Sequence, residues 1–425
     1  KTGDATLLAK IIRVVQEAQG SKAPVQRLVD KVASVFVPVV MFIAFVAFVV
    51  WMCVGGDDAL SHAILAFVTV LVVACPCALG LATPTAITVG IGKAASQGIL
   101  IKNAEALEGA CRLSAIVLDK TGTITEGRPA VIHAHWCNEE LAKSVLYAIE
   151  AHSEHPLAQA IIAYLPNEKL SEVRDFATFP GRGVVATVND ETCCVGNVLL
   201  LQEHGVAVPT HLLDVAAAWE SEANTVVWVA SGDNVLGVLA IADPLKSTSV
   251  QAIDDLRRQG IKIYMLTGDN QCTAQTIAHK VGIEHVHAGV LPEQKAQFVK
   301  NLQQSGEVVA MVGDGINDSA ALAQADVSIA MGHGSDIAMD VAAMTIVSSD
   351  LMRIAEAIHI SRQTVVAIRQ NLFWAFIYNI IGIPIASGAL YPCCGFLLNP
   401  MMASAAMALS SVSVVSNSLR LKWKK

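Results

Sequence analysis

Four long apolar runs constrain the fold of this chain more than any other feature of its sequence. They cover about residues 35–54, 63–81, 372–390 and 396–415. Each run approaches the roughly 20 residues that a helix needs to cross a bilayer. The chain is only 16% charged, whereas an ordinary soluble protein is roughly 25% charged. We therefore expect four transmembrane helices, in preference to the buried helices of a large soluble protein.

Lysine and arginine are distributed unevenly around these runs, which predicts an orientation. The short connections GGDD and YPCCGFLLNP contain neither residue, whereas the other ends of the runs carry many. Basic residues favour the cytoplasmic side of a membrane. We expect both termini and the large middle segment to be cytoplasmic, in a multi-pass protein that lies among the lipids of the plasma (inner) membrane.

Charge and cysteine usage exclude two further classes of protein. The net charge of −8 and the lack of a sustained basic patch argue against nucleic acid as a partner. Ten cysteines in 425 residues, several of them inside apolar runs, do not indicate a disulfide framework. They fit a reducing compartment, where cysteines mostly pack or bind metal.

The segment between the second and third runs predicts two soluble domains. Residues 96–128 and 236–355 alternate short apolar strands with amphipathic helices, the pattern of a parallel α/β sheet. Residues 129–235 break this rhythm, because GVVATV and ETCCVG indicate two strands around an Asn189-Asp190 hairpin turn. We interpret them as an inserted α+β domain. The remaining units are residues 1–30, with a cytoplasmic amphipathic linker helix over 4–20, then two membrane helices (31–95), and two more with a cytoplasmic tail (356–425).

Three predicted strands of the parallel sheet each end in a polar cluster. Functional groups gather at the carboxyl ends of the strands in such a sheet, so we expect these clusters to meet at one edge. The clusters are Asp119-Lys120-Thr121-Gly122-Thr123 after LSAIVLD, Thr267-Gly268-Asp269 after IKIYML, and Gly313-Asp314-Gly315-Ile316-Asn317-Asp318 after VVAMV.

This combination suits phosphoryl transfer to a carboxylate. Asp119 can attack the γ-phosphate of ATP in line and form an acyl phosphate. Asp314, together with Asp119, can hold Mg²⁺, which takes oxygen ligands. Thr267 can donate to the phosphoryl oxygens, and Lys295 can neutralise the charge that spreads over them.

The motifs DKTGT, TGD and GDGIND resemble those of the P-type ATPases, and the resemblance extends over nearly the whole chain. It implies a haloacid-dehalogenase-like phosphorylation domain, with Asp243-Pro244-Leu245-Lys246 as the hinge into it. Dehalogenase-type hydrolases carry a second aspartate two residues after the nucleophile as general acid/base, whereas this chain has Thr121, which favours a pump over a membrane-anchored phosphatase. The implied phosphorylation site comprises Asp119, Lys120, Thr121, Thr267, Asp269, Lys295, Asp314, Asn317 and Asp318, with Mg²⁺ on Asp119, Thr121 and Asp314.

The inserted domain resembles the nucleotide domain of heavy-metal P-type ATPases. The resemblance rests on Ser153-Glu154-His155-Pro156-Leu157, Gly181-Arg182-Gly183 and Gly196-Asn197 taken together. Alone, a histidine before proline is more often a helix cap, and Gly-x-Gly is a weak signal. The residues that would surround the adenine and ribose of ATP are Glu150, His155, Gly181, Gly183 and Asn197.

A Cys75-Pro76-Cys77 motif lies inside the second apolar run. Proline removes a backbone hydrogen bond and unwinds a helix locally, which can turn both thiols towards the bundle interior. Polar groups at such depth are usually functional. Thiolates select Cu⁺, Ag⁺, Zn²⁺ or Cd²⁺. The alternative is a pair of buried cysteines beside a packing kink.

The other apolar runs discriminate between these ions. They offer sulfur and neutral oxygens, with no carboxylate or lysine at membrane depth, so a divalent ion would leave more uncompensated charge than a monovalent one. The pattern resembles the copper(I) branch of the family, whereas the zinc and cadmium branch places a lysine and an aspartate in the last two spans. The implied Cu⁺ ligands are Cys75, Cys77, Tyr378, Asn379, Met407 and Ser411, with Asp30 receiving the ion at the cytoplasmic mouth.

The sequence therefore predicts a copper(I)-exporting P-type ATPase, supplied with Cu⁺ by a copper chaperone or glutathione. The rivals are a Zn²⁺/Cd²⁺ exporter, a membrane-anchored phosphatase, and a metal sensor with a vestigial ATP site. Copper pumps of this kind begin with a metal-binding domain, further helices and an actuator domain with a Thr-Gly-Glu loop, which we do not find. Because residues 1–30 resemble the end of an actuator, we expect a fragment that binds ATP and Cu⁺ without completing a transport cycle.

Overall fold

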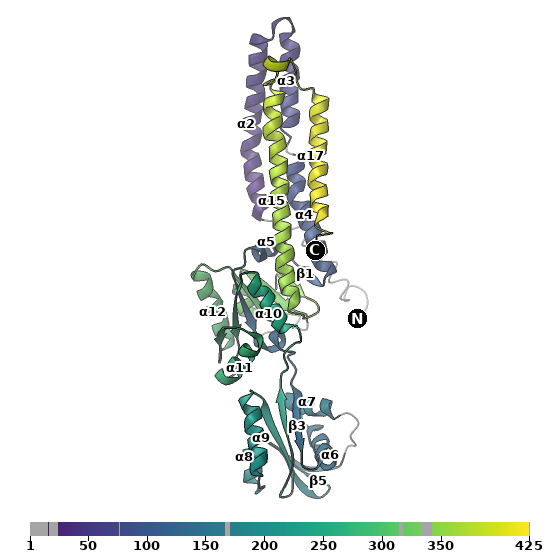
Figure 1. The fold of residues 1–425 in the computed structure, drawn as a ribbon, viewed down its shortest axis with the longest axis vertical. Helices are drawn as coiled ribbons and strands as arrows, with labels where there is room; N and C mark the ends of the chain where they lie inside the picture. Colours follow the sequence, from purple (N-terminus) through teal and green to yellow (C-terminus); the bar gives the residue numbers. More distant parts are fainter. Residues whose placement is uncertain are drawn as a thin grey trace.

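The computed structural model describes residues 16, 24–75, 77–165, 171–313, 318–332 and 342–424. The molecule is elongated, with a helical bundle at one end, an α/β domain in the middle and an antiparallel sheet domain at the other end (Figure 1). Apart from residue 16, the predicted linker helix over 4–20 lies outside the described residues, as do Asp314 and Asn317 of the third polar cluster.

The bundle contains four helical segments that are long and apolar enough to cross a membrane, as the sequence predicts. The second segment is interrupted at the Cys-Pro-Cys motif, and the third continues as one helix into the middle domain. A short 3-10 turn, Gly56–Asp58, joins the first two segments, and α16 lies between the last two. The bundle helices are α2 (Pro24–Val54), α3 (Ala59–Val73), α4 (Cys77–Ser96), α15 (Met352–Ala386), α16 (Tyr391–Cys394) and α17 (Pro400–Arg420).

A buried polar network joins α4, α15 and α17. The Asn371 amide donates to the Ala82 carbonyl at 3.0 Å and to the Ser418 hydroxyl at 2.8 Å. Its oxygen accepts from the Asn417 amide at 2.9 Å. Asn371 and Ser418 are fully buried. Unsatisfied polar groups are costly between membrane helices, so this network favours one arrangement of the three helices.

The middle domain is built on a seven-stranded sheet that is parallel except at one edge, where β1 runs antiparallel to β13. The three strands that precede the polar clusters lie side by side, in the order β11-β2-β9. Across the sheet the strands are β1 (Ile99–Ile101), β13 (Met344–Ile346), β12 (Val327–Met331), β11 (Val309–Gly313), β2 (Ala115–Asp119), β9 (Lys262–Leu266) and β10 (His285–His287).

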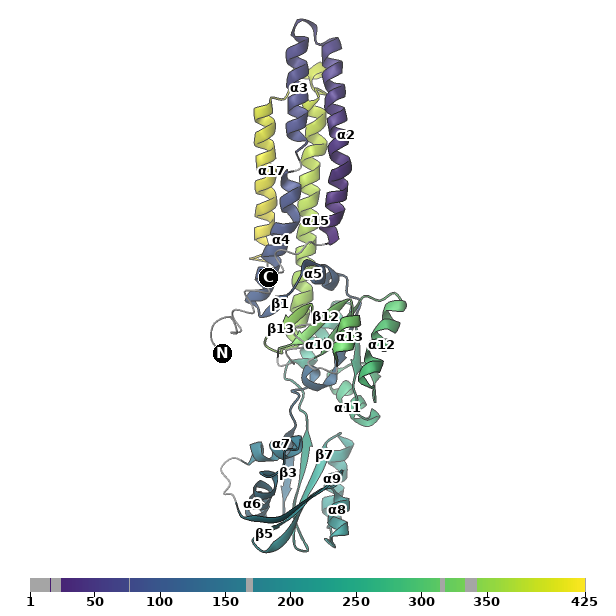
Figure 2. The same ribbon diagram turned by 180° about the vertical axis from the view of Figure 1, so that it is seen from behind.

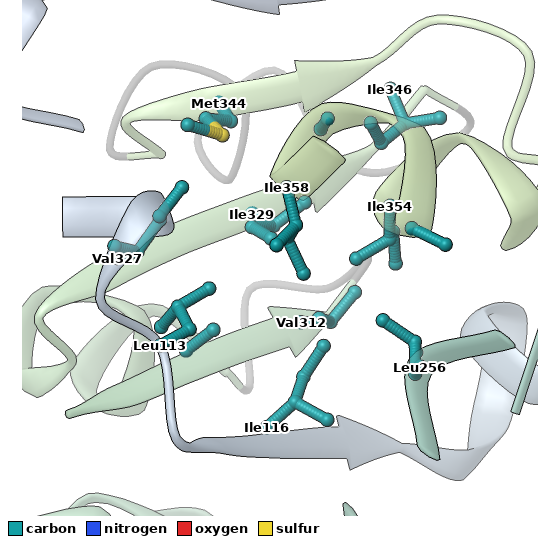
Figure 3. Packing of buried hydrophobic residues seen from close by; sticks show 14 of the residues in the cluster. Leu113, Ile116, Leu256, Val312, Val327, Ile329, Met344, Ile346, Ile354 and Ile358 are labelled. Atoms are coloured by element: carbon teal, nitrogen blue, oxygen red, sulfur yellow. The ribbon is translucent and has the colours of Figure 1, made fainter. Parts of the chain in front are cut away.

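Both faces of this sheet are buried, which explains its continuously apolar strands. Along β2, Ala115 and Val117 pack with α12 and α13, whereas Ile116 packs on the opposite face. Figure 3 shows Ile354 and Ile358, from the start of α15, above Ile116 and its neighbours. The base of α15 is therefore part of the core of this domain. Its other helices are α5 (Ala104–Cys111), α10 (Ser249–Arg258), α11 (Gln271–Val281), α12 (Pro292–Gln304) and α13 (Ser319–Gln324).

The inserted domain is a six-stranded antiparallel sheet with two helices on each face. Asn189 and Asp190 have positive φ values of 51° and 64°, which confirms the predicted hairpin turn between β5 and β6. The predicted boundary at residue 235 falls inside β8, which pairs with β3 and β7 and so belongs to this sheet. The elements are β3 (Ala130–Trp136), α6 (Glu139–Glu150), α7 (Pro156–Tyr164), β4 (Val173–Phe179), β5 (Gly183–Val188), β6 (Glu191–Gly196), α8 (Val198–Glu203), α9 (Thr210–Ser221), β7 (Thr225–Ser231) and β8 (Asn234–Ala242).

Candidate functional site

The carboxyl ends of β2, β9 and β11 meet at one edge of the middle sheet, as predicted. Asp119, the last residue of β2, stands opposite Leu266 of β9, and Leu118 stands opposite Val312 of β11. Thr267 directly follows β9 and is buried. The register therefore places the DKTGT and TGD motifs next to each other.

Lys295, near the start of α12, joins two of the predicted carboxylates. Its ammonium group lies 2.6 Å from Asp119 Oδ1 and 2.7 Å from Asp318 Oδ1. All three side chains are buried, at 6%, 7% and 1% exposure respectively. Burial alone would lower the pKa of Lys295, but the two carboxylates outweigh burial and raise it above its ordinary value. The lysine therefore stays charged at neutral pH and holds Asp119 at the strand end.

A second ion pair lies beside this cluster. Lys120 Nζ is 2.5 Å from Asp269 Oδ2, and the Asp269 amide donates to Thr267 Oγ1 at 3.1 Å. Thr121 follows Lys120 and is exposed. The structure thus brings together all of the predicted phosphorylation-site residues that it describes.

Gly313 ends β11 where the chain must pass close to this cluster. A Cβ atom at this position would collide with the carboxylate of Asp318. Only glycine therefore allows the third strand to end this near to Asp318 and Lys295.

The hinge was predicted from the sequence, but its contacts to the phosphorylation loop were not. The Asp243 carboxylate accepts from the Thr125 hydroxyl at 2.6 Å and from the Gly127 amide at 2.8 Å. Lys246 donates to the carbonyls of Gly122 (2.6 Å) and Ser349 (3.0 Å). The signal in the sequence was the polar DPLK segment directly after the apolar strand β8.

All five predicted nucleotide residues line one cavity of about 430 Å³ in the inserted domain. They come from four separate places: the end of α6, the residue before α7, the turn into β5 with its first residue, and the residue after β6. The remaining lining is largely apolar, as is typical of small-molecule sites. The five residues are Glu150, His155, Gly181, Gly183 and Asn197.

Backbone geometry explains the glycines of this cavity. Gly181 has a φ of 72° and no neighbouring atom where a Cβ would stand, so the backbone is open to the cavity. Gly183 has a φ of 144°, and a Cβ there would collide with the Val195 carbonyl. Asn197 fixes the loop, because its amide donates to the Gly181 carbonyl at 3.1 Å. His155 caps α7, accepting from the Leu157 amide at 3.2 Å.

A cleft of about 570 Å³ links this cavity to the phosphorylation site. Lys120 and Asp269 line the cleft on the side of the middle domain. Leu157 and Thr225 of the inserted domain line both the cleft and the nucleotide cavity. The two spaces are therefore neighbours, and a molecule as long as ATP could extend from one towards the other.

Glu150 is the one acidic group of the nucleotide cavity, and its burial raises its pKa to about 7 from 4.5. Between these values the unfolded chain is ionised at this position while the folded chain keeps the proton, so the inserted domain loses stability as pH rises through this range. The difference is equivalent to about 3 kcal/mol. We expect Glu150→Gln to have little effect at pH 4.5 and to stabilise the domain by up to this amount at pH 8.

Urea unfolding at the two pH values, followed by the fluorescence of Trp228 in β7, would measure this difference. Glu220→Gln is a suitable control, since Glu220 is exposed on α9 and outside the cavity. A pH-independent effect of Glu150→Gln would contradict the prediction.

The proposed transport ligands lie on α4, α15 and α17 and at the break before α4, and these three helices contact one another. Asn379 is buried, whereas Tyr378 and Met407 are half-buried. Gly382, one turn beyond Asn379, packs on Val73 just before the Cys-Pro-Cys break.

Not every predicted ligand is buried among the described helices. Cys75, at the break before α4, is exposed among the described helices, and its inward orientation stays a prediction. The Cys77 side chain lies outside what the structure describes. Half-buried Ser411 donates to the Met407 carbonyl at 3.3 Å, and Asp30 is exposed on α2. Among the described residues, no group of three or more His, Cys, Asp or Glu side chains forms a ready metal site.

Comparison with known proteins agrees with this geometry. A family model for haloacid dehalogenase-like hydrolases matches residues 113–326. A probable copper-transporting ATPase, PacS, of Synechocystis is 50% identical and is matched over 99% of this chain and 58% of its own length. A silver exporting P-type ATPase of Salmonella typhimurium is 47% identical and is matched over 99% of this chain and 52% of its own length. The chain thus spans little more than half the length of these curated relatives.

Two solved structures resemble the chain. The crystal structure of a zinc-transporting PIB-type ATPase in the E2.Pi state has a TM-score of 0.80 and 32% identity, over 99% of this chain and 68% of that one. The catalytic domain of the CPx-ATPase CopB-B has a TM-score of 0.50 and 29% identity, over 63% of this chain and 98% of that one. The chain therefore belongs to the P-type ATPases of the PIB class, and its catalytic domain is of the haloacid dehalogenase-like type.

Proposed function

We propose that the protein uses ATP to export Cu⁺, and also Ag⁺, from the cytosol through an aspartyl-phosphate intermediate. The observation that carries the proposal is the cleft that extends from the cavity around Glu150 to Lys120 and Asp269, beside Asp119. The copper- and silver-transporting relatives, at 50% and 47% identity, support the choice of ions.

In this proposal Asp119 is the nucleophile that accepts the γ-phosphoryl group. Lys295, which touches Asp119, would offset the charge of the transferring oxygens, and Thr267 would donate a hydrogen bond to them. Asp119, Asp314 and the Thr121 carbonyl are oxygen donors of the kind that Mg²⁺ prefers, so they would hold this ion. When bound, Mg²⁺ would supply positive charge that offsets the charge on the phosphate oxygens.

We propose that the cavity of the inserted domain binds the adenosine part of ATP. A protonated Glu150 offers both a donor and an acceptor, which complements the donor and acceptor edge of adenine. Gly181 and Gly183 leave the backbone open to the base and ribose, and His155 and Asn197 border the same space. The related catalytic domain of CopB-B changes conformation upon nucleotide binding, which supports this assignment.

The membrane site would hold Cu⁺ through sulfur and neutral oxygens. No acidic residue or lysine occurs between residues 370 and 419, the stretch that contributes Tyr378, Asn379, Met407 and Ser411. A monovalent ion would leave little uncompensated charge in this stretch, so it would need no carboxylate to balance its charge. Soft thiolates at Cys75 and Cys77 favour Cu⁺. The rival is a Zn²⁺ or Cd²⁺ exporter, which the resemblance to the zinc-transporting structure keeps open.

Competitive binding of Cu⁺ and Zn²⁺ to the purified chain separates these two proposals. We expect near-stoichiometric Cu⁺ binding that weakens at least tenfold in Cys75→Ser, because the serine hydroxyl is a poor ligand for a soft ion. Cys137→Ser is the matched control, since Cys137 is an exposed free cysteine next to the inserted sheet. Preferential Zn²⁺ binding that is lost in Cys75→Ser would assign the protein to the divalent exporters.

We propose the plasma (inner) membrane as the location, with both termini and the two soluble domains in the cytoplasm. The lack of basic residues in the two short outer connections supports this orientation. Exposed Asp30 at the start of α2 would then receive Cu⁺ from a copper chaperone or glutathione.

A further inference from the structure

A groove of about 490 Å³ lies at the end of the bundle that is farthest from the middle domain. Figure 2 shows the turn between α2 and α3 at this end. One wall of the groove is a stripe of α2, and the other comes from the first turn of α3, the turn after α15 and the start of α16. Because α2, α3 and α15 belong to segments that are long and apolar enough to cross a membrane, the medium around the groove is lipid.

The groove is about as long as one leaflet of a bilayer is thick. Its α2 wall runs from Ile43 to Val54, which is about 16 Å at 1.5 Å per residue. The hydrocarbon core of a bilayer is roughly 30 Å thick, so each leaflet contributes roughly 15 Å. Val46 and Val50 lie between these ends and are 42% and 51% exposed. The length and the apolar lining therefore suit one acyl chain.

Three aromatic rings stand at the end of the groove beside the α2–α3 turn. Trp51, His62 and Tyr391 come from α2, α3 and α16, and their ring centroids lie 4.8–5.4 Å apart. The indole is fixed, because its N–H donates to the Ser387 carbonyl at 3.0 Å. Tryptophan and tyrosine are enriched where a membrane meets water. The rings therefore place this end at the level of the lipid headgroups, and the Ile43 end lies towards the bilayer centre.

A glycine brings the two walls of the groove together at the aromatic end. Gly388, in the turn after α15, has a φ of 101°, and a Cβ there would lie 2.6 Å from the ring of Trp51. The backbone of this turn therefore rests directly on the indole. The shape of the aromatic end thus depends on backbone contact and not on flexible side chains.

The charges around this end are negative. The turn between α2 and α3 carries Asp57 and Asp58, both exposed, and the connection YPCCGFLLNP contains no lysine or arginine. Asp58 precedes His62 by four residues, so both lie on the same side of α3. An ammonium group at this place would meet carboxylates and the faces of aromatic rings, which attract cations. An anionic headgroup would meet no cation among the described residues that line the groove.

We propose that this groove binds a phospholipid with an ethanolamine headgroup from the surrounding membrane. The ammonium group would lie between Asp58 and the aromatic rings, and one acyl chain would follow α2 from Trp51 towards Ile43. In the proposed orientation of the protein, this lipid belongs to the outer leaflet. The proposal goes beyond ion export and does not depend on which metal is carried.

The position of the groove gives the bound lipid a structural consequence. Within the described part of the bundle, α2 packs mainly on α3, which leaves its stripe from Ile43 to Val54 largely open. An acyl chain along this stripe would add apolar contact between α2 and the turn after α15. It would thereby restrict movement of α2 relative to this turn.

Native mass spectrometry of the purified and delipidated chain tests the proposal, after equilibration in micelles with equal amounts of phosphatidylethanolamine and phosphatidylglycerol. The two lipids carry the same acyl chains. We expect about fivefold more retained phosphatidylethanolamine, the effect of a cation–π contact at a partly wet site. Val46→Phe fills the groove and should lower its retention about tenfold, because the acyl chain loses apolar contact. Val49→Phe is the matched control, since Val49 is 43% exposed on α2 and outside the groove, and should stay within about twofold of the wild type.

The double variant Asp57→Asn/Asp58→Asn tests the headgroup separately from the acyl chain. It should abolish the preference for phosphatidylethanolamine while total lipid retention persists. The control Asp214→Asn/Glu220→Gln removes the same charge from the exposed face of α9 and should keep the preference. An excess of soluble phosphoethanolamine should leave the lipid bound.

Fluorescence quenching locates the lipid without a variant of the groove lining valines. Phosphatidylethanolamine with brominated acyl chains should quench the part of the tryptophan emission that Trp51→Phe removes, and brominated phosphatidylglycerol should quench it less. Equal retention or equal quenching by the two lipids, or equal losses in Val46→Phe and Val49→Phe, would overturn the proposal. Displacement by phosphoethanolamine, a preference that survives in the aspartate double variant, or a dimer of the chain that Val46→Phe dissociates would do the same.

Discussion

Asparagine in place of Asp119 should reduce phosphoenzyme formation at least a thousandfold, below detection in an acid gel after labelling with [γ-³²P]ATP, Mg²⁺ and Cu⁺. An amide has almost the same shape as a carboxylate but cannot attack phosphorus to form an acyl phosphate. The variant should still fold, because Lys295 keeps Asp318 at 2.7 Å. The label on the wild-type chain should be lost in hydroxylamine, as expected for an acyl phosphate.

The matched control is Asp214→Asn, on the exposed face of α9, which should label normally. Retention of label in Asp119→Asn would move the nucleophile to another residue. The same assay distinguishes a pump from a membrane-anchored phosphatase, since Thr121 supplies no general base and the intermediate should persist. Thr121→Asp should shorten its lifetime, and an intermediate that never accumulates in the wild type would favour the phosphatase.

Methionine in place of Lys295 should destabilise the middle domain by about 3–5 kcal/mol at neutral pH. The substitution leaves Asp119 and Asp318 buried without their shared cation, and removal of one partner from a buried ion pair costs about this much. The pKa of Lys295 is raised above its ordinary value of 10.5. In the wild type the lysine therefore stabilises the folded chain fully at every pH below 10.5, and this contribution does not change between pH 6 and pH 8. In the variant the loss should grow with pH, because ionised carboxylates are the costly form.

Hydrogen exchange of the amides of β2 and β11, measured at pH 6 and pH 8, reports this local stability. Lys300→Met is the control, since Lys300 lies on the same helix but is exposed. Unchanged protection in Lys295→Met would show that the two carboxylates share a proton or have other partners in the folded chain.

The phosphorylation domain could be predicted well from the sequence because its signals are local and redundant. Apolar strands that end in Asp119 and Thr267 leave few arrangements other than neighbours in a parallel sheet. The hairpin at Asn189-Asp190 was equally clear, because few residues adopt two consecutive positive φ values. By contrast, β8 continues without a break into the hinge at Asp243, so its membership of the inserted sheet depends on pairing with β3, which sequence pattern does not reveal.

Long-range polar contacts were the least predictable part of the site. No local pattern indicates that Lys246 bonds the carbonyls of both Gly122 and Ser349, or that Asn371 bonds Ala82. Such contacts join residues far apart in the chain. They depend on which backbone carbonyls of the folded chain lie within reach of the donor side chain. The orientation of Cys75 stays a prediction for a similar reason. The proline indicates where the helix breaks, but neighbouring helices decide which way the thiol points.

The unbroken length of α15 has a mechanical consequence. Its first turns are fixed in the sheet core by Ile354 and Ile358 (Figure 3), and Asn379 lies about 32 Å beyond Ile358 along the helix at 1.5 Å per residue. A tilt of about 5° at the base, transmitted by a rigid rod, displaces Asn379 by about 2.8 Å, more than a metal–sulfur bond of about 2.3 Å. The helix would act as a lever, so an adjustment at the base too small to disrupt packing is enough to disassemble an ion site.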